Sequence, residues 1–211
     1  FEREEDNVAR VEKTKAIIDL AVDLGTHIVT THIGVIPADD SNPRFGVMQR
    51  ALTECGLYAK SKGVTLAIET GPEVATTLLH FLEGTKGGVG VNLDPANFVM
   101  VSGQDPADAV DLLGKYIVHT HLKDGKKLNS DMTPEQIYHG FAVGGVEALN
   151  ACKSFIELPI GEGTVPWDRY LAALRRVGYD GYLTIEREAG KQPLEDIRGA
   201  VGFIRGKVNF D

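Results

Sequence analysis

The segment KYIVHTHLKDG, residues 115–125, joins an apolar run to polar side chains at every second position. Alternate side chains of an extended strand point to opposite faces, so His119, His121 and Lys123 share one face with Ile117. The other face is apolar apart from one threonine. We therefore predict a strand whose polar face has a chemical task.

Strand-like and helical patterns alternate on both sides of this segment. Apolar and β-branched runs predict strands at 26–34, 64–70, 88–94, 116–122 and 181–188, with a weaker one at 155–161. Helical periodicity predicts helices at 2–24, 46–62, 72–84, 106–114, 165–178 and 194–206. Residues 124 to about 150 break the rhythm and are predicted to form a long loop with local structure.

Alternating strands and helices with short connections are typical of right-handed βαβ units around a parallel sheet. A closed (β/α)8 barrel takes about 250 residues, whereas this chain has 211 and opens on a helical pattern. We therefore expect a single domain over residues 1–211, a (β/α)8 TIM barrel that lacks its first one or two βα units. An open doubly wound sheet is the alternative.

Composition narrows the classes of function. A chain that is 43% hydrophobic and 25% charged suits one globular domain. Its formal net charge of −8 should repel nucleic acid and anionic membranes, and no apolar run reaches the length of a membrane span. Two cysteines, Cys55 and Cys152, without CxxC spacing argue against a disulfide framework and favour the cytoplasm. The expected partner is a small molecule, and homo-oligomerisation is left open.

Five of the predicted strands end in a side chain that can ionise or ligate a metal: His32, Glu69, Asp94, His121 and Glu186. In a (β/α) barrel the C-terminal ends of the strands surround one opening, where functional side chains gather. Taken singly, a carboxylate there is often a helix N-cap, and a histidine is often a hydrogen-bonded core residue. Carboxylates gathered together repel one another unless a cation offsets their charge.

The pattern therefore predicts a metal site. Two glutamates, one aspartate and one histidine would offer one divalent ion an oxygen-rich set of ligands with a single imidazole. Such a set suits Mn²⁺, our first choice, or Mg²⁺ or Co²⁺ better than a thiolate-type Zn²⁺ site, with Zn²⁺ a further candidate.

Five motifs carry a family resemblance: AIETGPE (67–73), NLDPANF (92–98), VHTHLKDG (118–125), PIGEGTVPW (159–167) and GYDGYLTIEREAG (178–190). Together they resemble the sugar phosphate isomerase/epimerase family, the xylose isomerase-like TIM barrels, over roughly residues 26–207. The resemblance implies four metal ligands, Glu69, Asp94, His121 and Glu186. It also implies that Glu69 and Glu186 exchange protons with a sugar or sugar phosphate through a cis-enediolate.

Six further polar residues are predicted to contact substrate: His32, Asn92, Asn97, His119, Lys123 and Glu162. Lys123, at the rim, could bind a hydroxyl or phosphate, or could instead pair with Asp124 or Asp94. Some sugar epimerases of the family place a histidine where this chain has Asn97, so their substrate contacts do not transfer directly.

Three rival functions share this scaffold. A lyase of 3-dehydroshikimate dehydratase type would use the same metal and proton removal but expel water. A DNA repair endonuclease would need more ligands and a basic face, which the net charge of −8 opposes. A non-catalytic sugar-binding barrel is opposed by the presence of both Glu69 and Glu186.

Overall fold

A computed structural model describes residues 1–128, 132–138 and 153–208 of the chain. Its centre is a five-stranded sheet in the order β1 (Ile28–Thr31), β2 (Thr65–Glu69), β3 (Val89–Leu93), β4 (Ile117–Leu122) and β7 (Leu183–Ile185). All four pairings between neighbours are parallel. The predicted parallel sheet of βα units is therefore confirmed.

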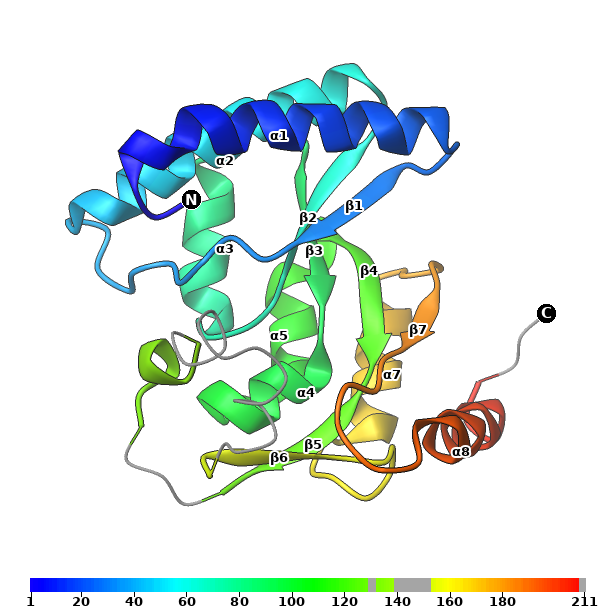
Figure 1. The fold of residues 1–211 in the computed structure, drawn as a ribbon. Coiled ribbons are helices and arrows are strands. Elements are labelled where there is room, and N and C mark those ends of the chain that lie inside the picture. The colour runs from blue at the N-terminus through cyan, green and yellow to red at the C-terminus, as the bar shows by residue number, and fades with distance from the viewer. Residues whose placement is uncertain (129–131, 139–152, 209–211) are drawn as a thin grey trace.

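Helices precede or follow these strands, as the periodicity predicts: α1 (Glu4–Asp23), α2 (Pro43–Ser61), α3 (Ala75–Glu83), α5 (Pro106–Leu113), α7 (Trp167–Arg176) and α8 (Pro193–Arg205). Figure 1 shows them packed around the outside of a curled sheet. The core lies between them, where Leu66 and Ile68 of β2 are buried with Met48 and Leu52 of α2. On β4, the hydroxyl of Thr120 hydrogen-bonds that of Tyr170 in α7, so this face of the strand is covered.

Three helices begin at an Asn-Pro or Asp-Pro pair. Asn42 caps α2 by accepting from the amide of Arg44 at 3.0 Å, and Asp105 caps α5 through the amide of Ala107 at 2.8 Å. Asp94 caps α4 (Pro95–Asn97), which continues into the π-helical turn η1 (Phe98–Ser102). A proline fits the first helical position because its missing N–H has no partner there anyway. The sequence analysis did not predict the turn after Asp94.

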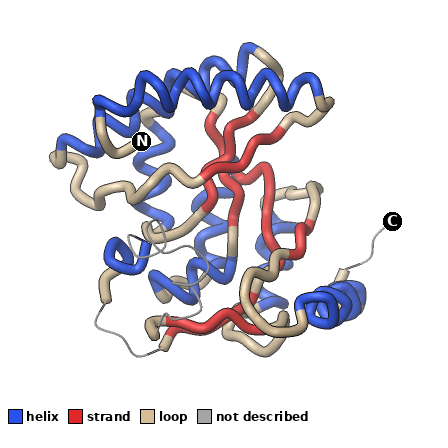
Figure 2. The backbone as a smooth tube through the Cα atoms, viewed as in Figure 1, coloured by secondary structure: helices blue, strands red, loops and turns tan. Residues whose placement is uncertain are grey.

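The weak strand predicted at 155–161 exists but is not part of the parallel sheet. β6 (Phe155–Leu158) pairs antiparallel with β5 (Asp124–Lys127), from Asp124 opposite Leu158 to Lys127 opposite Phe155. Figure 2 shows this two-stranded ribbon apart from the five central strands. The predicted loop at 124–150 was thus wrong at its start, because backbone pairing with a distant segment makes the polar sequence DGKK extended. Its residues 129–131 and 139–150 lie outside the described residues.

A helix must be both long and apolar to cross a membrane. Within the described ranges, none of the helices is both long and apolar enough to cross a membrane.

Candidate metal centre

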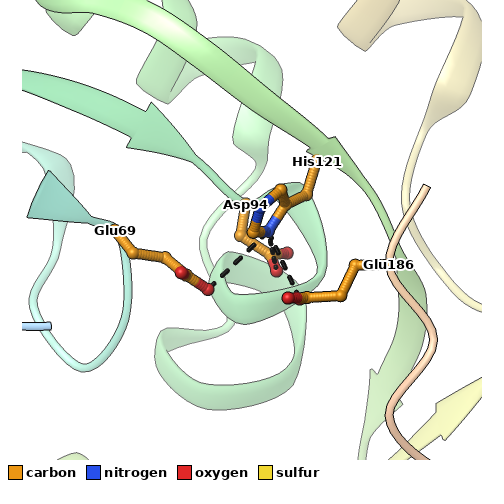
Figure 3. Close-up of side chains that lie close together, drawn as sticks. All are labelled: Glu69, Asp94, His121 and Glu186. Carbon is orange, nitrogen blue, oxygen red and sulfur yellow. Dashed lines mark hydrogen bonds and ion pairs between the residues drawn. The ribbon is translucent and has the colours of Figure 1, made fainter. Parts of the chain in front are cut away.

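Four side chains converge at one end of the sheet: Glu69, Asp94, His121 and Glu186. One ligand atom from each lies within 4.8 Å of the others. Figure 3 shows the His121 ring between the two glutamates, with Asp94 beside it. Nδ1 of His121 lies 3.3 Å from Glu186 Oε2, 3.4 Å from Asp94 Oδ2 and 3.7 Å from Glu69 Oε1. The convergence predicted from the strand ends is confirmed in geometry.

Strand register explains why residues at different levels meet. Glu69 pairs with Asn92, and Asn92 pairs with His119. Asp94 and His121 each lie two residues further along, and Glu186 lies two residues beyond Thr184, the partner of His121. Strands of a barrel are tilted against its axis, so a register that climbs in this way brings side chains of successive strands to one point.

Asp94 divides its two carboxylate oxygens between structure and site. Oδ1 accepts from the backbone amides of Ala96 at 2.8 Å and Asn97 at 3.1 Å. Oδ2 faces His121 instead, and the side chain is completely buried. The N-cap interpretation and the ligand interpretation of this residue are thus compatible, because each uses a different oxygen.

The loops after β2 and β3 are braced together next to Asp94. The amide of Asp94 donates to Thr70 Oγ1 at 2.8 Å, and Asn97 Nδ2 donates to the carbonyl of Thr70 at 2.9 Å. Asn97 is predicted to contact substrate, but its side-chain NH₂ group donates to the backbone of Thr70. The bracing fixes Glu69 and Asp94 relative to each other.

Asn92 orients the His121 ring from the other side. Its Nδ2 lies 3.1 Å from Nε2 of His121 and 3.5 Å from Glu69 Oε2. The amide oxygen of Asn92 is buried without a hydrogen-bond partner among the described residues. A half-turn of the amide would let this oxygen accept a hydrogen bond from the N–H at Nε2, which leaves the Nδ1 lone pair for a cation. A buried neighbour of this kind fits a metal-ligating histidine.

Three of the four clustered side chains have pKa values shifted from their ordinary values, in different directions. Burial, and then the charge of Asp94, raises the pKa of Glu69 to about 7. Burial opposes a charge on His121, but hydrogen bonds to Asp94 and Glu186 raise its pKa to about 10. Burial also disfavours ionised Glu186, yet the hydrogen bond from His121 and the charge of Lys123 lower its pKa to about 2. The carboxylates thus favour the protonated, cationic forms of His121 and Lys123, as a centre with excess negative charge should.

Lys123 is not at the rim, where the sequence placed it. Its side chain is only 4% exposed, and Nζ donates to Glu186 Oε2 at 2.8 Å and to Glu188. Asp94 Oδ2 lies 3.8 Å from Nζ. The ion-pair interpretation is therefore the better one, with Glu186 and Glu188 as the main partners, because the buried ammonium needs counter-charges that only the folded chain brings together.

Asp124, the other partner considered for Lys123, is engaged elsewhere. Its carboxylate accepts from the amides of Gly125, Gly161 and Val165 and from the indole of Trp167. This fixes the PIGEG segment beside β5. Glu162 of that segment is exposed, and no hydrogen bond or ion pair found in the described chain joins it to the cluster.

The two other predicted substrate histidines lie near the cluster. His32 is 63% exposed, and its Nε2 lies 3.6 Å from Glu69 Oε2. His119 Nε2 lies 3.0 Å from the Thr184 hydroxyl, and its ring meets that of His121 edge-on. Burial and the charge of His121 lower the pKa of His119. His32 thus borders Glu69 and His119 borders His121, and neither belongs to the group of four.

Three acidic residues near the centre were missed by the sequence analysis: Glu73, Glu157 and Glu188. Glu188 shares a strand face with Glu186 two residues earlier, and this spacing in TIERE could have revealed it. Glu157 lies within β6, between the apolar residues Ile156 and Leu158. Glu73 lies in the TGPE loop, where burial raises its pKa to about 8.

Solved structures of other proteins share the fold of this chain. A xylose isomerase domain protein from Planctomyces limnophilus is 28% identical, with a TM-score of 0.77 over 96% of this chain and 65% of its own length. A D-tagatose 3-epimerase-like protein is 21% identical, with a TM-score of 0.66 over 98% of this chain and 74% of its own. A probable 3-DHS dehydratase from Bacillus anthracis is also 21% identical, with a TM-score of 0.68 over 94% and 70%. The chain thus spans less than two thirds of the first structure's length.

No curated protein matches the chain significantly. The family model that describes the xylose isomerase-like TIM barrel matches residues 2–207, nearly the whole chain. The curled sheet of five parallel strands corresponds to part of such a barrel, so the open doubly wound alternative is wrong. The chain therefore belongs to the xylose isomerase-like TIM barrel family.

Proposed function

We propose that this protein is a divalent metal-dependent isomerase or epimerase of a sugar or sugar phosphate. The observation that carries the proposal is the gathering of Glu69, Asp94, His121 and Glu186 within 4.8 Å at the strand ends. Mn²⁺ is the first choice of ion, because three carboxylates and one imidazole suit it. When bound, the ion would stabilise the negative charge that develops on a substrate carbonyl oxygen.

The two glutamates differ in a way that suits proton transfer. Although burial opposes its charge, His121 and Lys123 lower the pKa of Glu186, so we assign this ionised carboxylate to accept the carbon-bound proton next to the carbonyl. Burial raises the pKa of Glu69, which makes it the more readily protonated of the two, so we assign it to return a proton to the intermediate. Figure 3 shows the two carboxylates on opposite sides of His121, an arrangement that suits removal on one face of an enediolate and return on the other.

Hydrogen exchange tests the proposal directly. The protein is incubated with Mn²⁺ and a panel of ketoses, aldoses and their phosphates in D₂O, and exchange at carbon is followed by NMR. We expect exchange next to the carbonyl of at least one sugar, lost on treatment with EDTA. Glu186→Gln should abolish exchange while it preserves the fold, and Glu83→Gln, which changes an exposed carboxylate at the end of α3, is the matched control. Absence of exchange with every sugar would refute the proposal.

The structural neighbour described as a probable 3-DHS dehydratase gives a second candidate on the same scaffold. Such a lyase would remove a proton with the same carboxylates and then expel water. Incubation with 3-dehydroshikimate separates the two candidates, because loss of water there without exchange in any sugar would favour the lyase. Cytoplasmic location and a small-molecule partner remain parts of the proposal.

A further inference from the structure

The ammonium of Lys123 lies beside the proposed metal centre. Four carboxylates surround its Nζ, which donates to Glu186 and Glu188 and lies 3.8 Å from Asp94 and 3.9 Å from Glu157. A buried ammonium with these partners neutralises much of the negative charge that gathers there. The cluster thus has a counter-ion from its own chain.

Glu157 is fixed by one of its oxygens and free at the other. Oε1 accepts from Arg187 Nη1 at 2.6 Å and from the amides of Glu188 at 3.0 Å and Ala189 at 3.2 Å. Oε2 has no hydrogen-bond partner in the described part of the chain, although the side chain is only 1% exposed. A buried carboxylate oxygen without a donor is unusual, and this one lies just beyond hydrogen-bond reach of Lys123.

A divalent ion and Lys123 would compete for the same atom. Oε2 of Glu186 accepts from Lys123 at 2.8 Å and also lies 3.3 Å from Nδ1 of His121. An ion held by His121 and Glu186 would stand next to the ammonium and repel it. The nearby oxygen of Glu157 offers the ammonium another acceptor, because a small shift would complete a hydrogen bond there.

We propose that Lys123 is a displaceable counter-ion: its ammonium pairs with Glu186 when no metal is bound and shifts to Oε2 of Glu157 when a divalent ion binds. The inference rests on the proposed metal site and assigns Lys123 and Glu157 to the control of its affinity. Lys123 is thus a positioning residue rather than a substrate contact.

Calorimetric titration of the metal-free protein with Mn²⁺ tests this in a double-mutant cycle. Lys123→Met, of similar length without charge, should bind Mn²⁺ about tenfold more tightly than the wild type. Glu157→Gln keeps an oxygen for Arg187 but offers Lys123 no carboxylate, so it should bind about tenfold more weakly. In the Lys123→Met background, Glu157→Gln should have almost no effect.

The cycle separates this mechanism from a plain loss of charge. If Glu157 acted only through its distant negative charge, Glu157→Gln would weaken binding equally in both backgrounds, and this result would overturn the inference. Weaker binding by Lys123→Met would also overturn it.

Should Lys123→Met fail to fold, Glu157→Gln alone decides, since unchanged or tighter binding contradicts the shift. Glu83→Gln, which removes an exposed carboxylate at the end of α3, should leave the affinity unchanged. Absence of Mn²⁺ binding by the wild type would overturn the metal site itself, and this inference with it.

Discussion

Asp94 and Asp124 are both almost completely buried, yet the protein satisfies them differently. Both oxygens of Asp124 accept from neutral N–H groups, with Gly125 and Val165 on one oxygen and Gly161 and Trp167 on the other. Only one oxygen of Asp94 has such donors. The other faces His121 and Lys123. Burial alone therefore does not distinguish the two residues, whereas only Asp94 leaves an oxygen facing cations, as the proposed metal site requires.

Asp124→Ala should have the largest effect on folding, because it removes the acceptor of four buried donors. We expect the free energy of unfolding to fall by about 3 to 5 kcal/mol. Urea denaturation in the presence of EDTA measures the change. A loss below about 1 kcal/mol would show that water replaces the carboxylate and that the contrast with Asp94 is weaker than we infer.

Asp94→Asn should instead affect the metal and spare the fold. Asparagine is as good an N-cap as aspartate, so α4 keeps its start, and the repulsion in the cluster decreases. At a concentration 100 times its Kd for the wild type, Mn²⁺ should raise the free energy of unfolding of the wild type by about 2.7 kcal/mol. The same concentration should stabilise the variant far less. Thermal unfolding with Mn²⁺ and with EDTA gives both values. A large destabilisation of Asp94→Asn in EDTA would contradict this division of roles.

Glu73 shows a third way to bury a carboxyl group, namely to keep it protonated. Burial raises its pKa from 4.5 to about 8, so the folded protein holds a proton that the unfolded chain releases. The contribution of Glu73 to stability is thus fully present below pH 4.5 and is lost as the pH rises toward about 8.

The side chain of the Glu73→Gln variant cannot ionise, so the variant should not lose this stability as the pH rises. Relative to the wild type, it should gain about 1.4 kcal/mol per pH unit within that window. Denaturation curves of both proteins at several pH values check the slope. Parallel pH dependence in the two proteins would mean that Glu73 is ionised in the folded state.

The sequence predicted the parts of the site that depend on a single strand. Each apolar run that ends in Glu69, Asp94, His121 or Glu186 is visible locally, and the rule for barrel strand ends brings the four together. The burial of Lys123 could not be predicted in this way, because Glu157 and Glu188 come from distant segments. The pairing of β5 with β6 was missed for the same reason, since DGKK has no strand pattern of its own.

The hydrogen bonds around the four proposed ligands divide them into two separately braced halves, with Glu69, Asp94 and, through Asn92, His121 in one and Glu186 in the other. Thr70 and Asn97 tie the ends of β2 and β3 together, and so fix Glu69 relative to Asp94. Glu157 and Arg187, itself bound to Asp196, fix the segment that carries Glu186. A change of ion radius would therefore alter the spacing between the halves more than the geometry within either one. Selectivity between Mg²⁺ and Mn²⁺ should accordingly depend on residues that never touch the ion.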